Sequence, residues 1–579
     1  GVKPSEITAV TFTNKAADEL TQRIRQALPG RRSLNQMQVG TFHSLCYRLL
    51  ARSGTELSLA DQGQAEECAG ETIEALELPC TVRQFLTAIS LHKAGLSSAQ
   101  GFAAYMADDS AAETGFTLTQ EAADRYQQAL ECRKLMDFDD LLLNMLRLLE
   151  QEQKAEYRKQ HFSYLLVDEF QDISPVQYRL IKAWNKGGRE LFVIGDPDQS
   201  IYGFRGADGK CFQRLRAERP ELREIRLVEN YRSTPEVLEA AAPVIEKNPG
   251  GCRRLRPNRP SGPAVRMVRS PDAFSEGVFP AKEIGRMTGG VDMLEAQALG
   301  HERTVRAFSD IAVLCRTHRQ LELVEKCLRH DDIPCLVTGR EDFLDDPAVR
   351  GALGFLRSLV VPADNAALES ALRLLWNCPA DLIQKAQTLC QKMGTLDSAA
   401  LQEAVRGHGI LENWLDRTEV WLPLVQTETP RKLVEQWEEQ YGTSPALERL
   451  RNTAVFHEDF DSLWDALVLG QEADLRRASG KHWASGAVRL MTLHGAKGLE
   501  FPAVFLAGLS AGAMPLESPG RPADAEEERR LFFVGLTRAR EELILTAAPE
   551  FSPFLRELPE TVVRETTGRR RVAEQLRLF

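Results

Sequence analysis

The sequence lacks the features that mark membrane-spanning and disulfide-stabilised proteins. No stretch of its 579 residues approaches the roughly 18 consecutive apolar residues of a membrane-spanning helix, and no secretory hydrophobic region opens the chain. The 11 cysteines contain no C-x-x-C pair. This argues against a structural zinc or a disulfide framework and predicts a reducing cytosol.

An excess of positive charge is also missing. The chain has 72 Lys and Arg against 83 Asp and Glu, a formal net charge of −11. Overall charge therefore does not indicate a nucleic-acid-binding protein, and any DNA or RNA site must be a local groove. There is no internal repeat and no low-complexity tract.

What the sequence does contain is typical of a globular protein with several domains. At 43% hydrophobic and 27% charged residues it can form several buried cores, and its length predicts about four domains or subdomains. Apolar runs alternate with helical periodicity, which predicts α/β units with parallel sheets, interrupted by helical stretches at about 45–149 and 346–485. Residues 248–263, rich in Pro, Gly and Arg, are the clearest linker. The predicted strands are residues 7–13, 164–167, 191–194, 311–316, 488–493, 503–508 and 542–546.

Two acidic residues follow the predicted strand at 164–167. Asp168 and Glu169 would lie at its carboxyl end, where parallel sheets bind their ligands. Asp168 would hold Mg²⁺ and Glu169 would orient or deprotonate a water in phosphate chemistry. Taken alone, such a pair is more often a solvated turn.

The next predicted strand runs into a turn-rich segment with a different chemistry. Gln199 can sense a terminal phosphate or its attacking water, because its side chain both donates and accepts hydrogen bonds. Tyr202, Phe204 and Arg205 follow within six residues, and two aromatics with an arginine suit stacking on nucleic-acid bases. The alternative is that the aromatics are core and the arginine is a surface charge.

These segments resemble motifs II and III of the UvrD/Rep/PcrA-type superfamily 1 DNA helicases. The remaining motifs of that family are present in order: T-F-T-N-K-A-A at 11–17, G-T-F-H-S at 40–44, E-N-Y-R-S at 229–233, L-M-T-L-H-G-A-K-G-L-E-F at 490–501 and V-G-L-T-R-A-R at 534–540. The resemblance covers essentially the whole chain and is weakest in the two helical insertions.

The resemblance implies two RecA-like parallel-sheet motor domains, each with a mainly helical inserted subdomain. The first motor domain would comprise residues 1–47 and 137–247, with its insertion at 48–136; the second would comprise 248–360 and 486–579, with its insertion at 361–485. The second insertion is short for the family.

The resemblance also assigns roles to residues. Arg232 and Arg538 would reach the γ-phosphate of ATP as arginine fingers, Tyr231 would stack on adenine, and Glu500 would accept from the ribose with Gly498 allowing close approach. Arg540 is expected to be a surface charge, and His43 and His494 could instead be core histidines. The residues expected to contact single-stranded DNA are Phe12, Asn14, Thr41, Phe42, His43, Tyr202, Phe204, Arg205 and His494.

The phosphate-binding loop of such ATPases does not occur in this sequence. No G-x-x-x-x-G-K-[ST] is present, and the chain begins with Gly1 about ten residues before the first family motif. We therefore expect a truncated form of a longer helicase that neither binds ATP tightly nor hydrolyses it alone.

The C-terminal residues predict a protein partner. Q-L-x-L-F resembles the peptide with which bacterial replication proteins dock on the sliding clamp; Gln575 would bond at the edge of a hydrophobic groove filled by Leu576, Leu578 and Phe579. The alternatives are packing on the chain's own domain, or DNA contact by the neighbouring arginines.

The sequence thus favours an ATP-dependent 3′→5′ DNA helicase or translocase in repair or replication. It would act with ATP and Mg²⁺ on single-stranded DNA and on junctions between single and double strands. The alternative is a non-catalytic DNA-binding or clamp-associated scaffold derived from a helicase. Retention of Asp168, Glu169, Gln199, Arg232 and Arg538 argues against it. A helicase–nuclease subunit ranks lower, because only about 30 residues follow the last predicted strand.

Overall fold

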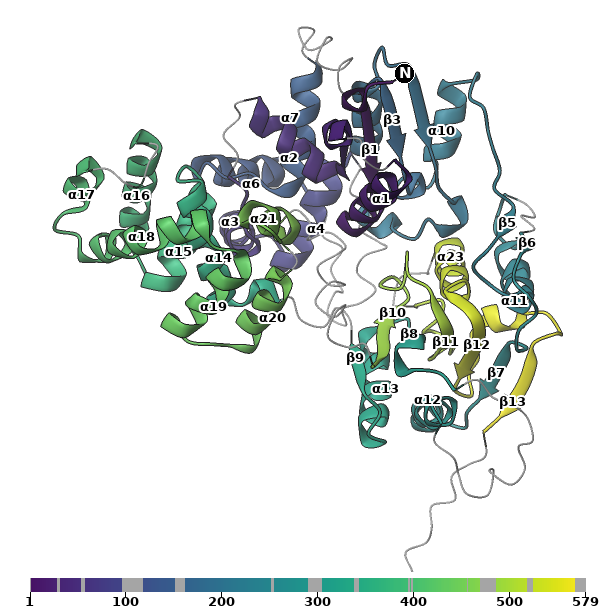
Figure 1. Ribbon diagram of the computed structural model, residues 1–579. Coiled ribbons are helices and arrows are strands. Elements are labelled where there is room, and N and C mark those ends of the chain that lie inside the picture. The colour runs from purple at the N-terminus through teal and green to yellow at the C-terminus, as the bar shows by residue number, and fades with distance from the viewer. Residues whose placement is uncertain are drawn as a thin grey trace, which may run out of the picture. The chain divides into compact units, whose positions relative to one another are not determined.

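The computed structural model describes most of the chain in two compact units (Figure 1). The described residues are 2–28, 32–53, 58–95, 118–150, 162–250, 255–289, 305–337, 343–393, 396, 399–455, 457–468, 486–517 and 524–567. The first unit contains those up to 195 and from 343 to 468, and the second contains those from 196 to 337 and from 486 to 567. Within these ranges no helix is long and apolar enough to cross a membrane.

The first unit is built on a four-stranded parallel sheet with strand order β2-β1-β3-β4. Its strands are β1 (Ile7–Thr11), β2 (Gln38–Thr41), β3 (Tyr164–Val167) and β4 (Glu190–Val193). Its accompanying helices are α1 (Asn14–Ala27), α2 (Phe42–Arg52), α7 (Phe138–Glu150) and α9 (Pro175–Trp184). The first strand ends at Thr11, earlier than predicted, because Thr13 caps α1 by accepting a hydrogen bond from the Ala16 N–H.

One face of this sheet is covered and the other is partly bare. Leu165 and Val167 of β3 are buried, whereas Leu166 is 37% exposed; Phe192 of β4 and Ile194, which directly follows β4, are 52% and 39% exposed. Leu166 pairs in register with Phe192, so these side chains share a face. Among the described residues β4 is the last strand of the sheet.

Two helical groups complete the first unit. One consists of α3 (Gln62–Ala75), α4 (Val82–Lys93) and α6 (Gln120–Cys132). The other consists of α14 (Pro347–Val360), α15 (Asn365–Trp376), α16 (Ala380–Met393), α17 (Ala399–Val405), α18 (Gly409–Thr427), α19 (Pro430–Tyr441), α20 (Pro445–Ala454) and α21 (Phe460–Val468). Buried Trp414, Trp421 and Trp437 lie in the core of the second group.

The second helical group differs from the expected insertion in where it begins. Helix α14, which the sequence-based boundary at 360 assigns to the second motor domain, packs into the core of this group. Its buried Arg357 donates to the Tyr47 hydroxyl at 2.7 Å and pairs with Asp364 at 3.4 Å. Asp364 in turn accepts a hydrogen bond from Ser58, just before α3. Gln64 of α3 donates to the Ala366 carbonyl of α15 at 3.3 Å, so a buried polar contact joins the two helical groups.

The second unit is built on a seven-stranded parallel sheet with order β13-β7-β12-β11-β8-β10-β9. The strands are β7 (Arg266–Arg269), β8 (Ile311–Cys315), β9 (Cys335–Val337), β10 (Val488–Thr492), β11 (Phe501–Leu506), β12 (Ala539–Ala547) and β13 (Val563–Thr566). The five residues of β8 are all buried, as expected for a central parallel strand. A short pair, β5 (Glu229–Asn230) and β6 (Arg256–Pro257), lies apart from this sheet, and β6 falls in the predicted linker.

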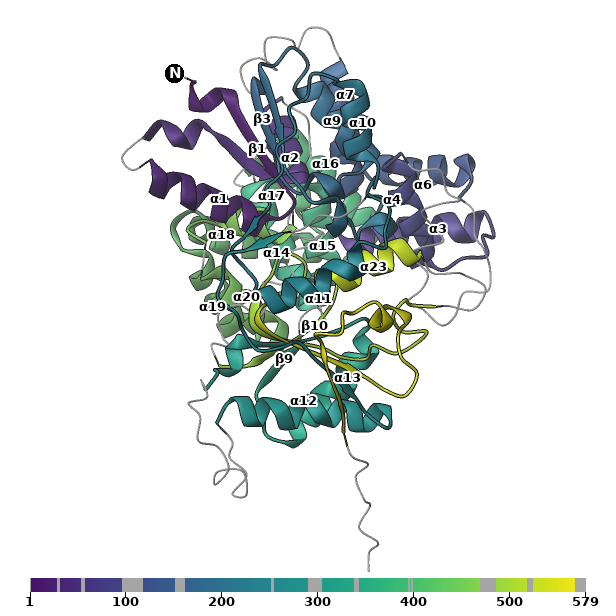
Figure 2. The ribbon, with the colours of Figure 1, turned by 90° about the vertical axis from the view of Figure 1, so that its right-hand side faces the viewer.

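Helices cover both faces of the second sheet (Figure 2). α12 (Ala273–Met287) and α13 (His318–His330) lie together on one side, and α11 (Pro235–Ile245) and α23 (Ala525–Leu536) lie together on the other. α10 (Cys211–Glu218) follows the short helical turns η6 (Pro197–Gln199) and η7 (Gly203–Arg205). The predicted α/β architecture with parallel sheets is confirmed.

Candidate functional site

In the first unit, the predicted carboxylate pair lies at the carboxyl end of β3. The Asp168 N–H donates to the Val10 carbonyl, and an Asp168 carboxylate oxygen accepts from the Glu169 N–H, both at 2.9 Å. Glu169 has a left-handed backbone, with φ of 50°, and such strain in a non-glycine residue persists where the surroundings enforce it. Burial and the neighbouring Glu169 charge raise the pKa of Asp168.

This donor set fits a magnesium ion that keeps most of its water. Carboxylate oxygens are the ligands that Mg²⁺ prefers, and the ion is often bound through one or two carboxylates plus substrate phosphates. No group of three or more His, Cys, Asp or Glu side chains suited to a metal occurs in the described part of the chain. Asp168 can therefore supply one protein ligand, and a cation there would relieve the repulsion that raises its pKa.

The residues predicted to contact DNA from the first unit separate into two sets. Phe12 and Asn14, at the start of α1, are partly exposed, and Thr41 caps α2 through the Ser44 N–H. Phe42 and His43 are only 4% exposed. The ring of Phe42 stacks on Trp184 with a centroid distance of 5.7 Å, and His43 meets Phe138 edge to face at 6.3 Å. The prediction that Phe42 and His43 line a DNA strand is therefore corrected: their rings are packed in the core of the first unit.

In the second unit, the structure brings together the three residues of the predicted stacking platform and His494, which was also expected to contact DNA. The Phe204 ring lies 6.0 Å from Tyr202 and 5.1 Å from His494, centroid to centroid. Arg205 lies over both Tyr202 and Phe204, at 5.6 and 5.7 Å from their centroids. Lys497 lies 4.9 Å from the Tyr202 centroid. We call Tyr202, Phe204, Arg205 and His494 the stacking cluster.

The electrostatics of the stacking cluster favour a neutral imidazole. Burial lowers the pKa of His494 well below its usual value, and Arg316, Arg205 and Lys497 lower it further. Tyr202 is only 5% exposed, whereas Phe204 and His494 are partly exposed and Arg205 is exposed. The accessible part of the cluster is therefore Phe204 and His494 beside a fixed positive charge, a combination suited to binding the bases and phosphates of a single strand.

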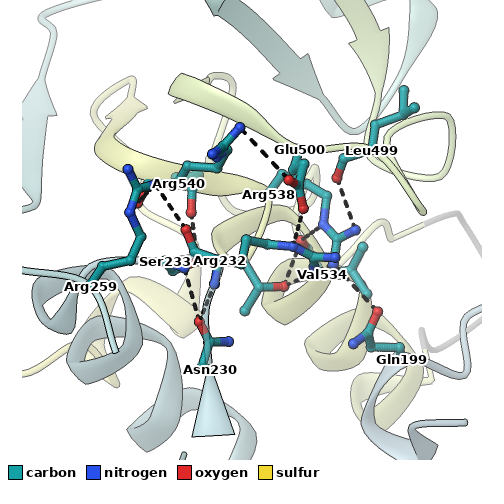
Figure 3. A network of polar contacts seen from close by, with 12 residues as sticks. Gln199, Asn230, Arg232, Ser233, Arg259, Leu499, Glu500, Val534, Arg538 and Arg540 are labelled. Carbon is teal, nitrogen blue, oxygen red and sulfur yellow. Dashed lines mark hydrogen bonds and ion pairs between the residues drawn. The ribbon is translucent and has the colours of Figure 1, made fainter. Parts of the chain in front are cut away.

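Next to the stacking cluster, Arg538 and Gln199 are hydrogen-bonded (Figure 3). Arg538 is 1% exposed, and its guanidinium donates to the Val534 carbonyl at 2.8 Å, the Leu499 carbonyl at 3.1 Å and the Gln199 side-chain oxygen at 3.4 Å. Gln199 also donates to Asp196 at 2.9 Å. Two of the predicted phosphate-sensing groups are thus held in one network.

Arg232, the other predicted arginine finger, is more exposed than Arg538. Arg232 forms an ion pair with Glu500, with side-chain exposures of 38% and 41% (Figure 3). Arg540, expected to be a lone surface charge, also reaches Glu500, at 3.9 Å. Glu500, expected to accept from a ribose, is therefore engaged by two arginines. Tyr231 is 74% exposed, and Gly498 has the left-handed φ of 74° that favours glycine.

Three residues that the sequence analysis missed hold the backbone between Gln199 and Gly203. Lys497 donates to the Gln199 carbonyl at 2.6 Å, Arg530 to the Ser200 carbonyl at 2.8 Å, and Glu527 accepts from the Gly203 N–H at 3.1 Å. The E-E-E-R-R run at 526–530 is the only signal in the sequence that could have drawn attention to two of them.

The residues predicted to bind a sliding clamp, Gln575, Leu576, Leu578 and Phe579, lie outside the described residues. The clamp contact therefore stays a prediction from the sequence.

Comparison with known proteins matches most of the chain to one helicase family. Residues 1–220 match the UvrD/REP helicase N-terminal domain, and residues 225–395 and 431–550 match the UvrD-like helicase C-terminal domain. The ATP-dependent DNA helicase PcrA of Staphylococcus epidermidis RP62A is 29% identical over 633 residues, covering 98% of this chain and 82% of that protein. The PcrA of Staphylococcus aureus MRSA252 is 28% identical over 637 residues, with coverages of 99% and 82%. Among solved structures, the C-terminal domain of a possible DNA helicase from Lactobacillus plantarum WCFS1 aligns with a TM-score of 0.24 at 10% identity, covering 58% of this chain and 99% of that domain.

Proposed function

This chain belongs to the UvrD/Rep helicase family, and we propose that it acts as an ATP-dependent DNA helicase that translocates along single-stranded DNA in the 3′→5′ direction. One observation carries the proposal. The short segment 199–205 contains both Gln199, which is hydrogen-bonded to Arg538, and the three residues that build the stacking cluster with His494. A group suited to sensing phosphate and groups suited to gripping bases are therefore separated by only a few peptide bonds.

The proposed chemistry assigns a different task to each group. Asp168 would hold a magnesium ion, which would neutralise charge on the phosphate oxygens, and Glu169 would orient the attacking water. Arg232 and Arg538 stabilise the charge that develops on the γ-phosphate, a task worth about 10³- to 10⁵-fold in rate for an arginine finger. Tyr231, with its exposed ring, stacks on the adenine.

The magnitudes are compatible with a motor that holds one or two bases at a time. Stacking of a base on an aromatic side chain is worth about 1–3 kcal/mol. One DNA base-pair step stacks with about 1.4 kcal/mol. Stacking of a base on Phe204, which Tyr202 supports from below the surface, can therefore compete with reannealing, while ATP hydrolysis supplies the direction.

We further propose that this polypeptide does not hydrolyse ATP by itself. The G-x-x-x-x-G-K-[ST] sequence that cradles the phosphates does not occur in it. Asp168, Glu169, Gln199, Arg232 and Arg538 supply only the remaining parts of such a site. DNA-stimulated hydrolysis by the purified polypeptide at a rate typical of helicases would contradict this.

The test of the helicase proposal uses a form of the protein that contains a P-loop sequence. Single-strand-stimulated ATP hydrolysis and unwinding of duplexes with 3′ or 5′ single-stranded tails are measured for the parent and for Arg232→Ala. We expect unwinding from the 3′ tail only, and loss of hydrolysis in Arg232→Ala with single-strand affinity within about twofold of the parent. Loss of DNA binding with normal hydrolysis would contradict the assignment, and binding without any hydrolysis in the parent would favour the scaffold alternative.

A further inference from the structure

The backbone that carries the stacking cluster is fixed by charged side chains from distant parts of the second unit. The contacts from Lys497, Arg530 and Glu527 to residues 199–203 join positions 298, 330 and 324 residues apart in the chain. Two of the three side chains belong to α23. Glu527 and Arg530 reach the segment at its backbone, whereas Lys497 also lies over the Tyr202 ring at 4.9 Å from its centroid. The effect of the two α23 side chains is therefore on the backbone that presents the rings.

Of these contacts, the one between Glu527 and Gly203 is the most specific. Gly203 opens the turn η7, which presents Phe204 and Arg205, and it directly follows Tyr202. A Cβ atom built on Gly203 would lie 2.6 Å from a Glu527 carboxylate oxygen, so the carboxylate would have to move away from its present position if this residue carried a side chain. Burial raises the pKa of Glu527, and Arg530 partly offsets this. A buried carboxylate is stable only where a nearby donor or positive charge compensates for its burial, and here the Gly203 N–H is one such donor.

The same helix also ends at the phosphate-sensing network. α23 spans 12 residues, about 18 Å along its axis, and Arg538 follows it by two positions. Glu527 and Arg530 of α23 contact Gly203 and Ser200, while Arg538, just beyond the helix, contacts Gln199. The helix and the residues that follow it therefore hold the segment at three positions.

We propose that Glu527 is a positioning residue for base binding, which fixes the geometry of Tyr202, Phe204 and Arg205 by accepting the hydrogen bond of the Gly203 amide. Arg530 and Lys497 fix the preceding residues in the same way. This inference rests on the proposed function, because it takes single-stranded DNA as the ligand of the stacking cluster. It assigns Glu527 no direct contact with DNA.

The experiment compares two oligonucleotides of equal length and charge, one of thymidines and one with abasic sugars. Both present the same phosphates, and only the first has bases to stack. Dissociation constants are measured by fluorescence anisotropy over a range of salt for the parent, Glu527→Ala, Glu527→Gln and Glu526→Ala. Glu526 is the matched control, since it lies in the same first turn of α23. Its carboxylate is more than half exposed and lies 4.0 Å from Arg530, so its removal should leave the Gly203 contact intact.

We expect Glu527→Ala to weaken binding of the thymidine strand about tenfold, the order of one hydrogen bond to a charged group. Binding of the abasic strand and the slope of log Kd against log salt should be unchanged, because the phosphate contacts remain. Glu527→Gln keeps an acceptor of the same size and should bind like the parent. A general loss of structure would instead weaken both strands.

A second variant keeps the inference testable if Glu527→Ala unfolds. Gly203→Ala keeps the glutamate but pushes its carboxylate away from the amide. It should cause the same loss of affinity for the thymidine strand. In the double variant Gly203→Ala/Glu527→Ala the two losses should not add, since each removes the same contact. Additive losses, parent-like binding by Glu527→Ala, or an equal loss in Glu526→Ala would overturn the inference. Equal binding of both strands by the parent would instead contradict the proposed stacking function itself.

Discussion

The guanidinium of Arg538 donates a hydrogen bond to the side-chain oxygen of Gln199, 339 residues earlier in the chain, at 3.4 Å. Arg538 follows α23 and Gln199 precedes the stacking cluster. Movement of Arg538 toward a nearby negative charge would therefore pull on Gln199, and so on the segment that carries the stacking cluster, through one hydrogen bond.

Replacing Arg538 should destabilise the protein more than replacing Arg232, although both are proposed to act on the γ-phosphate. Arg538→Ala should lower the free energy of unfolding by at least about 1.5–3 kcal/mol, the contribution of one hydrogen bond to a charged group. Arg232→Ala should lower it by less than about 1 kcal/mol, because its pair with Glu500 is half-exposed. Urea unfolding followed by circular dichroism measures both. Equal destabilisation would contradict the burial that separates the two residues.

Phe204→Ala should weaken binding of single-stranded DNA without unfolding the protein. The ring contacts Tyr202 and His494, and loss of one base–aromatic stack costs about 1–3 kcal/mol, or roughly 5- to 150-fold in Kd. Anisotropy with a labelled thymidine oligonucleotide measures the loss. Unchanged affinity would exclude Phe204 from the path of the strand.

Phe42→Ala should show the opposite pattern. Its ring is buried against Trp184, so we expect a loss of about 3–5 kcal/mol in the free energy of unfolding. The fraction that remains folded should bind DNA within about twofold of the parent. A large loss of affinity at full stability would restore the sequence-based assignment of Phe42 to the DNA path.

Asp168→Asn should stabilise the protein at neutral pH. Burial and Glu169 raise the pKa of Asp168 in the folded state, so the charged carboxylate disfavours folding. Below the ordinary aspartate pKa of about 4, Asp168 is protonated in both the folded and unfolded states and does not change the free energy of unfolding. As pH rises from there through the raised pKa of the folded state, its ionisation lowers the free energy of unfolding. Unfolding free energies at pH 7 and near pH 4 should show a gain for Asp168→Asn that is present at the higher pH and shrinks at the lower. A gain independent of pH would mean that charge is not its cause.

Much of the first sheet and of the stacking cluster could be predicted from the sequence. The strand at 164–167 was placed without error, since a short apolar run followed by acidic residues has few other interpretations. β4 begins one residue earlier than predicted, at Glu190, because backbone pairing with Tyr164 of β3 can include a polar residue that hydropathy excludes. The stacking residues 202, 204 and 205 were found because they are close in sequence.

What the sequence could not reveal depends on contacts between distant residues. Whether Phe42 faces DNA or the core is decided by Trp184, more than a hundred positions away. Glu527 and Arg530 read as ordinary charges at the start of a helix until the structure places Gly203 and Ser200 beside them. The pairing of Glu500 with Arg232 likewise joins residues 268 positions apart.

The bare edge of the first sheet has a consequence for handling the protein. β4 is the last strand of this sheet in the described part of the chain, and the apolar side chains of Phe192 and Ile194 are exposed beside it, so this edge is a template for intermolecular pairing. Self-association should therefore rise with concentration and be reduced by a lysine in place of Phe192, so dilute samples of that variant are the ones to use for quantitative binding work.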